Sequence, residues 1–172
     1  AIVGGLLFYF MIYLSLGTNL GDKPSNLRRA IELLSKEGII NAVSGYWSSD
    51  PWGFESNNSF INIAVAITTE YSPIEFLNIT KRIEKEMGRT AKSTDGYCDR
   101  IIDIDIIDYN GEVISTKELT LPHPHIEERK FVLYPLYEIA PNWEHAVTRK
   151  NIKNLIADCT DTGNCTKITE DK

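Results

Sequence analysis

Apolar and acidic residues alternate in the segment 99–107, which reads Asp-Arg-Ile-Ile-Asp-Ile-Asp-Ile-Ile. Its β-branched residues favour a strand, and the side chains of a strand alternate between its two faces. Asp103 and Asp105 are therefore predicted to point to one face, with Ile102 and Ile104 on the other. The Cα atoms of the two aspartates would be roughly 6–7 Å apart, so their carboxylates would repel each other unless a cation lay between them.

Further runs of apolar residues predict the other elements. Strands are expected at residues 11–16, 39–49 and 60–69. Helices are expected from about residue 24 to 36, from the capping box at residues 72–75 to Gly88, and over residues 131–139. The resulting β-α-β-β-α-β order is typical of a ferredoxin-like α+β fold, an antiparallel sheet with helices packed on one face. We expect the other face to be open for loops and ligand.

The dipeptide Asn110-Gly111 predicts an additional hairpin. Both residue types readily adopt the left-handed backbone conformation that two-residue hairpin turns require. We therefore expect the acidic strand to pair with the strand that follows this turn.

We expect one domain over residues 11–148, flanked by an extension and a tail. Residues 1–10 belong to an uncharged run of sixteen residues, which is shorter than the roughly 20 residues that span a bilayer. No basic region of a signal peptide precedes this run, so we expect an added or upstream extension that packs on its own domain or on a second copy of the chain. Residues 149–172 are polar and are expected to be peripheral, although Ile152 and Leu155 could dock a short helix.

Composition limits the kinds of partner. The net charge of −6 argues against a general nucleic-acid binder, and an anionic substrate would need local basic residues or a metal. Cys98, Cys159 and Cys165 have neither CxxC nor zinc-ligand spacing, and a Cys159–Cys165 disulfide is the less favoured alternative to free thiols. We expect a cytoplasmic protein without nucleic-acid or membrane partners that is a monomer or a weak dimer.

The paired aspartates have two interpretations. Hard carboxylate oxygens at this spacing suit Mg²⁺, which binds one or two carboxylates together with substrate phosphates. An amphipathic strand with its acids in water would show the same pattern. Arg89, Arg100 and Arg129 bracket the strand. A planar guanidinium can chelate phosphate, although surface ion pairing is the usual fate of arginine.

Polar and aromatic residues elsewhere leave similar alternatives. The Pro-His-Pro-His run at residues 122–125 supplies a phosphate donor or a metal ligand, or is simply a turn. Phe60 and Asn62 share one face of a strand, and Phe60 is typical of a core. The amide of a buried Asn62 needs partners, which a flat heterocycle with donors and acceptors would supply. The glycine-rich turn at residues 17–21 has no phosphate-loop pattern and is interpreted as structural.

Six segments, in order along the chain, carry a resemblance to a known family. They are residues 15–22 (SLGTNLGD), 50–53 (DPWG), 60–62 (FIN), 84–89 (EKEMGR), 99–105 (DRIIDID) and 121–124 (LPHP), the last followed by Arg129 and Phe131. Together they resemble 6-hydroxymethyl-7,8-dihydropterin pyrophosphokinase, an enzyme of folate biosynthesis, over about residues 11–145. The acidic strand followed by the Leu-Pro-His segment is highly specific for this family.

The resemblance implies an ATP-dependent pyrophosphokinase (a diphosphotransferase). Its substrates would be ATP and 6-hydroxymethyl-7,8-dihydropterin, and its products AMP and the pterin diphosphate. Two Mg²⁺ ions would be held by Asp103 and Asp105. Two alternatives stay open: another Mg²⁺-dependent phosphoryl or nucleotidyl transferase, and a non-catalytic protein that binds pterin or nucleotide.

The resemblance also implies roles for individual residues. Arg89, on a mobile loop over residues 89–98, and Arg100 would join the two aspartates as catalytic residues. The implied ATP-binding residues are Glu84, Arg100, Ile106, His123 and Arg129. The implied pterin-binding residues are Ser49, Trp52, Phe60, Asn62 and Phe131. Of these, Phe60 and Phe131 would stack on opposite faces of the pterin ring.

Three positions depart from the family pattern. Ala91 stands where a second loop arginine is often found, and Glu118 stands where some relatives place an arginine that contacts the nucleotide. Pro124 stands where an aromatic residue is common. These departures leave the implied reaction intact but bear on the charge network of the loop and on the affinity for ATP.

Overall fold

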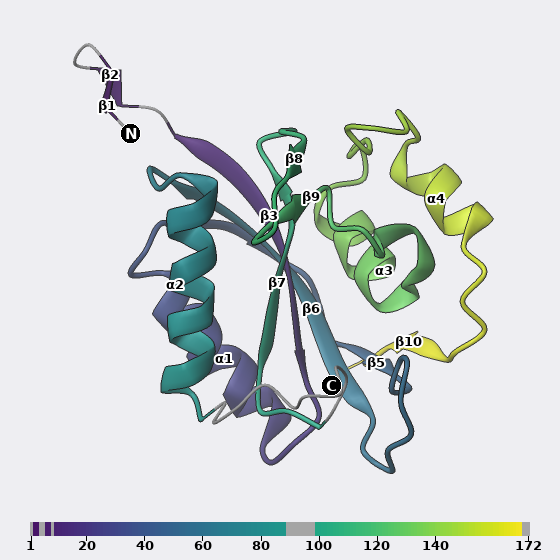
Figure 1. Ribbon diagram of the computed structural model, residues 1–172. Helices are drawn as coiled ribbons and strands as arrows, with labels where there is room; N and C mark the ends of the chain where they lie inside the picture. The colour runs from purple at the N-terminus through teal and green to yellow at the C-terminus, as the bar shows by residue number, and fades with distance from the viewer. Residues whose placement is uncertain (1, 4–5, 8, 89–98, 170–172) are drawn as a thin grey trace.

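The computed structural model describes residues 2–3, 6–7, 9–88 and 99–169, and its centre is an antiparallel sheet (Figure 1). The strands of this sheet are β3 (Phe10–Thr18), β4 (Ile39–Val43), β5 (Trp47–Ser49), β6 (Phe60–Thr69), β7 (Asp103–Tyr109) and β10 (Cys165–Lys167). They lie in the order β10-β5-β6-β3-β7, and β4 also pairs with β6. The strand order β4-β6-β3-β7 confirms the ferredoxin-like topology.

Helices lie on both faces of this sheet (Figure 1). They are α1 (Lys23–Leu34) and α2 (Pro73–Glu86) on one face, and α3 (Lys130–Ile139) and α4 (Ile152–Asp158) on the other, with the 3-10 helix η1 (Ile126–Glu128) before α3. The expectation of an open second face is therefore wrong. Leu133 and Leu136 of α3 pack with Ile107 of β7 in a second apolar cluster, because this part of β7 is apolar on both faces.

The side chains of β3 that are buried under α1 and α2 determine which of its other side chains point to the opposite face of the sheet. Ile12, Leu14 and Leu16 of β3 are fully buried between the sheet and the helices α1 and α2. Because strand side chains alternate, Ser15 and Gly17 point to the opposite face, where the candidate site lies.

The predicted boundaries of α2 are confirmed. The Glu75 carboxylate accepts a hydrogen bond of 2.8 Å from the backbone N–H of Ser72, as a capping box requires. Beyond the helix, Gly88 has a φ of +102°, a conformation that glycine adopts without steric cost.

Two strand predictions are wrong in detail. The expected strand 39–49 is divided into β4 and β5, and between them Ser44 accepts a hydrogen bond from the backbone N–H of Ala64. Asn110 and Gly111 do form a turn with positive φ angles, but β8 (Ile114–Ser115) after it pairs with β9 (Thr120–Leu121) and not with β7. The additional hairpin is therefore β8–β9.

The segment 149–172 was expected to be peripheral, but several of its described residues, up to Lys167, pack on or pair with the rest of the domain. Ile152 and Leu155 of α4 are 0% and 1% exposed in the second apolar cluster. Further on, β10 pairs with β5 and forms one edge of the main sheet. The apolar spacing of the short helix outweighs the polar composition of the segment.

At the other terminus, β3 begins one residue earlier than expected. Phe10 pairs with Thr69, and its ring lies 5.6 Å from that of Tyr109. β1 (Ile2–Val3) and β2 (Leu6–Leu7) pair with each other and lie apart from the main sheet (Figure 1). In the part of the chain that the structure describes, no helix is long and apolar enough to span a bilayer. The role of residues 1–10 stays a prediction.

Replacing Leu155 by alanine is expected to lower the free energy of unfolding by about 2–5 kcal/mol, because a fully buried leucine leaves a cavity. Lys153→Ala on the exposed side of α4 is the control, with an expected change within about 0.5 kcal/mol. Urea denaturation of both variants measures the difference. Similar, small losses would show that α4 does not stabilise the domain.

Candidate functional site

A pocket lies on the sheet face that α3 covers only in part, between β7 on one side and the segment after β5 on the other. Its acidic and basic end is lined by Arg100, Asp103, Asp105 and Arg129. Its aromatic end is lined by Trp52, Phe54, Phe60 and Phe131, with Ser49 and Asn62 beside them. One hollow thus joins a charged end to a flat, apolar end.

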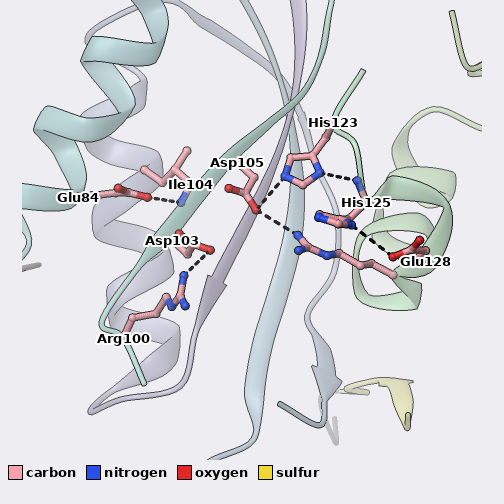
Figure 2. A network of polar contacts seen from close by, with 9 residues as sticks. Glu84, Arg100, Asp103, Ile104, Asp105, His123, His125 and Glu128 are labelled. Carbon is pink, nitrogen blue, oxygen red and sulfur yellow. Dashed lines mark hydrogen bonds and ion pairs between the residues drawn. The ribbon is translucent and has the colours of Figure 1, made fainter. Parts of the chain in front are cut away.

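The two aspartates lie as the alternation predicts. Asp103 and Asp105 line the pocket, whereas Ile102 and Ile104 are buried in the core on the other face. Arg100, three residues before Asp103, approaches its carboxylate with an Nη1–Oδ2 distance of 2.9 Å (Figure 2). The acidic strand therefore carries part of its own compensating charge.

Asp105 lies farther from its positive neighbour. Its Oδ2 is 3.7 Å from Nη1 of Arg129. The same oxygen is 3.8 Å from Nε2 of His123 (Figure 2). Burial, followed by repulsion from the carboxylate of Asp103, raises the pKa of Asp105, although Arg129 counteracts the shift. The two carboxylates thus repel each other when both are ionised, and a cation bound between them would offset this repulsion.

His123 is held as a neutral donor. Its Nδ1 accepts a hydrogen bond of 3.2 Å from the backbone N–H of His125, so the proton of the neutral ring lies on Nε2, which faces Asp105. Burial, with a contribution from the charge of Arg129, lowers the pKa of His123 to about 4. At neutral pH the ring therefore offers a donor without adding positive charge.

Arg129 connects the two ends of the pocket. It is 5% exposed, and its guanidinium carbon lies 4.4 Å from the centre of the Trp52 ring and 5.7 Å from that of Phe131. Such cation–π geometry keeps the planar group among apolar rings while its Nη1 faces Asp105. The arginine is thereby oriented toward the charged end without leaving the aromatic one.

The amide of Asn62 already has protein partners. Its Nδ2 donates to Oγ of Ser49 at 2.8 Å and to the backbone oxygen of Trp47 at 3.3 Å. The expectation that a heterocycle would supply the partners of this amide is therefore wrong for the nitrogen. Gly17 is the cross-strand partner of Asn62, and a Cβ added there would lie 3.0 Å from Asn62 Oδ1, a close contact that would force the amide to shift.

Glu84 and Ile106 lie outside the pocket lining. Glu84 is buried in α2, and its Oε1 accepts a hydrogen bond of 2.8 Å from the backbone N–H of Ile104 (Figure 2). This bond satisfies a backbone donor of β7, which is an edge strand of the main sheet. The side chain of Ile106 is buried in the core, so it cannot contact a ligand. Its backbone points to the same edge as that of Ile104, two residues earlier, and only this backbone could bind a nucleotide.

That Asn19 holds the backbone at Arg100 was not predicted from the sequence; its hydrogen bonds to Arg100 and Asp99 are called the Asn19 anchor below. Asn19 is 1% exposed, its Oδ1 accepts the Arg100 backbone N–H at 2.7 Å, and its Nδ2 donates to Asp99 at 2.6 Å. Asn58 also donates to Asp99, at 2.8 Å. These hydrogen bonds give the glycine-rich turn that contains Asn19 a structural role, although Gly17 of the same turn also lines the pocket. The sequence alone held no signal for the contact, because the burial of Asn19 is known only from the structure.

Some predicted positions are not described by the structure. Arg89, Ala91 and the rest of the loop over residues 89–98 lie outside the described residues. Glu118 and Pro124 are exposed, and neither is among the residues that line the pocket.

The family match and two similar known proteins point to the same enzyme family. The family described as 7,8-dihydro-6-hydroxymethylpterin-pyrophosphokinase (HPPK) matches residues 13–141. A protein of Porphyromonas gingivalis named 2-amino-4-hydroxy-6-hydroxymethyldihydropteridine pyrophosphokinase is 46% identical over 138 residues, which cover 78% of this chain and 93% of that protein. A protein of the same name from Aquifex aeolicus is 44% identical over 144 residues, covering 84% and 89%.

One solved structure with the same fold is a longer chain. A Plasmodium falciparum HPPK-DHPS triple mutant with SDX-DHP aligns with a TM-score of 0.71 and 18% identity. The alignment covers 90% of this chain and 45% of that one, so this chain spans under half of it. At this identity the likeness shows the fold alone.

Asn19→Ala is expected to lower the free energy of unfolding by about 1–3 kcal/mol, since it leaves the buried N–H of Arg100 without its acceptor. Asn58→Ala removes only an exposed contact to Asp99 and is expected to cost less than about 1 kcal/mol. Chemical denaturation compares the two. An Asn19 variant as stable as the Asn58 variant would rule out the anchor.

Proposed function

This chain belongs to the 7,8-dihydro-6-hydroxymethylpterin-pyrophosphokinase family, and we propose that it transfers the pyrophosphoryl group of ATP to the hydroxymethyl group of 6-hydroxymethyl-7,8-dihydropterin, a step of folate biosynthesis. AMP and the pterin diphosphate are the products. One observation carries the assignment of the site: Asp103, Asp105 and the basic side chains converge at one end of a pocket whose other end is aromatic and amide-lined.

The charged end suits the triphosphate of ATP and Mg²⁺. Among the described residues, no group of three or more His, Cys, Asp or Glu side chains could hold a metal by itself. Asp103 and Asp105 supply hard oxygen ligands, which fits Mg²⁺ bound jointly by one or two carboxylates and substrate phosphates. Two such ions, held by these aspartates, would neutralise phosphate charge and lower the pKa of the attacking hydroxyl.

The basic residues have separate tasks at this end. Arg100 and Arg129 offer planar guanidinium groups to the phosphate oxygens. His123 donates from Nε2 while remaining neutral. Because both arginines also face aspartates, they are already oriented before ATP arrives, and little further ordering is needed.

The reaction is an in-line displacement. The oxygen of the pterin hydroxymethyl group forms a bond to the β-phosphorus of ATP, the bond from this phosphorus to the α,β-bridging oxygen breaks, and AMP leaves. The hydroxyl proton is released. The side chains contribute by positioning the two substrates and by stabilising charge on the transferred group, which is the main source of catalysis in phosphoryl transfer.

The aromatic end suits a pterin. Phe60 and Phe131 provide faces for stacking on the flat bicyclic ring. Because Ser49 and Trp47 hold the nitrogen of Asn62, the amide plane is fixed and its oxygen is left to accept a donor of the pterin. Trp52 supports Arg129 at the junction of the two ends.

Asp103→Asn and Asp105→Asn are each expected to lower turnover by more than about 100-fold while the protein stays folded, because charge stabilisation at the phosphates is lost. Glu112→Gln, an exposed change just beyond β7, is the control and should keep full activity. AMP formation is followed by chromatography. ADP as the product would indicate a different phosphoryl transferase, and activity within tenfold of the unaltered protein would reject the two-aspartate site.

Phe131→Ala is expected to weaken the binding of hydroxymethyldihydropterin by about 5- to 10-fold, because stacking contributes on the order of 1 kcal/mol beyond burial. The affinity for an ATP analogue should change less. Tyr137→Ala removes a partly exposed aromatic ring from the same helix and serves as the control. Calorimetry that shows equal losses for both ligands would contradict the assignment of the aromatic end.

A further inference from the structure

The segment 159–167, called the C-terminal clamp below, lies beyond residues 13–141 that the family matches, yet it contacts the walls of the aromatic end. It runs from the end of α4 through a turn into β10 (Figure 1). Three sets of contacts join it to Asp50, which lines the pocket, to Lys130 between two lining residues, and through Glu138 to Trp47, which contacts the lining residue Asn62.

The first contact is between Asn164 and Asp50. The Asp50 carboxylate accepts hydrogen bonds of 3.0 Å from both the backbone N–H and the side-chain amide of Asn164. In return, the Asp50 N–H donates to the Asn164 carbonyl at 3.3 Å. Asp50 lies between Ser49 and Trp52, so this contact fixes the start of the segment that forms one pocket wall.

The second contact is between Asp161 and the start of α3. The N-cap position of α3 is Arg129, which has no acceptor in its side chain. Asp161 instead accepts the N–H of Lys130, the first helical residue, at 3.2 Å. A carboxylate at this end of a helix is favoured by the helix dipole, and here it holds the turn that carries both Arg129 and Phe131.

The third contact runs through Glu138 to Trp47. Lys167 in β10 lies 3.0 Å from the carboxylate of Glu138, which also accepts the indole N–H of Trp47 at 3.0 Å. The backbone oxygen of Trp47 in turn accepts from Asn62. The pairing of β10 with β5 places Cys165 opposite Ser49, so the backbone of the same wall is paired as well.

From these contacts we propose that the C-terminal clamp positions the pterin end of the pocket, an inference that rests on the proposed function. Asn164 is the positioning residue that acts through Asp50 on Ser49 and Trp52. β10 and β7 form opposite edges of the main sheet, so Asn164, next to β10, is remote from Asp103 and Asp105.

Asp161 also holds the turn that carries Arg129, so the selective test lies at Asn164, whose partner Asp50 takes no part in the hydrogen bonds and ion pairs described above for Arg129 and the two aspartates. A change at Asn164 should therefore alter the affinity for pterin and leave the affinity for ATP nearly unchanged.

The test measures two dissociation constants by calorimetry, one for hydroxymethyldihydropterin and one for α,β-methylene-ATP with Mg²⁺. Asn164→Asp replaces a donor by a second carboxylate beside Asp50, and we expect it to weaken pterin binding by about 5- to 10-fold, with ATP-analogue binding within about twofold. Thr162→Ala, an exposed change in the same turn, is the control and should alter neither. If Asn164→Asp does not fold, Asn164→Ala takes its place with a smaller expected loss of the same kind.

A charge swap distinguishes positioning from general destabilisation. In the double variant Asp50→Asn/Asn164→Asp the hydrogen bond can form again with donor and acceptor exchanged, so we expect pterin affinity to recover to within about threefold, and the single variants complete the cycle. Unchanged pterin affinity in Asn164→Asp, equal losses for both ligands, or no recovery in the swap would each overturn the proposal. Failure of the unaltered protein to form AMP from ATP and the pterin would instead reject the proposed function.

Discussion

Repulsion between two carboxylates on one strand is the constraint on which the rest of the site depends. Asp103 and Asp105 must share a face because Ile102 and Ile104 are buried in the core on the other. Their charge explains why basic groups approach from two directions, with Arg100 from the same segment and Arg129 from the start of α3. Under the proposed function, a divalent cation held by these carboxylates would enter together with the polyphosphate, and the cation and the two arginines would share its negative charge.

The neutral state of His123 fits this balance. If His123 were protonated, it would be a third positively charged side chain at the charged end, in addition to Arg100 and Arg129. It would then bind the aspartate oxygens more strongly and compete with a metal ion for them. The hydrogen bond from the His125 backbone instead orients the ring so that only Nε2 is a donor. Arg129 then links this end to the aromatic end through its contact with Trp52. The two substrates would therefore meet beside Arg129, whose position is fixed by Asp105 at the charged end and by Trp52 at the aromatic end.

Local sequence patterns predicted the elements well where one physical signal dominated. The capping box at Ser72 and the alternation in β7 were reproduced, because each depends on neighbours within a few residues. Predictions that depended on distant partners were less successful. Asn62 was expected to need a ligand, but the hydroxyl of Ser49 on the neighbouring strand satisfies its nitrogen. Ile106 was implied as a nucleotide contact, yet its side chain is buried and only its backbone is available.

The sequence by itself determined the ferredoxin-like order of elements, the shared face of the aspartates, and the family, because periodicity and motif spacing are properties of neighbouring residues. Only the tertiary structure decided how the pocket is closed and held. Asn19 and Arg100, which it holds by a hydrogen bond, are 81 positions apart, and Asp50 and Asn164 are 114 positions apart. Such polar contacts depend on the burial and register of whole strands, and no local pattern of residue types records which distant group will complete a hydrogen bond.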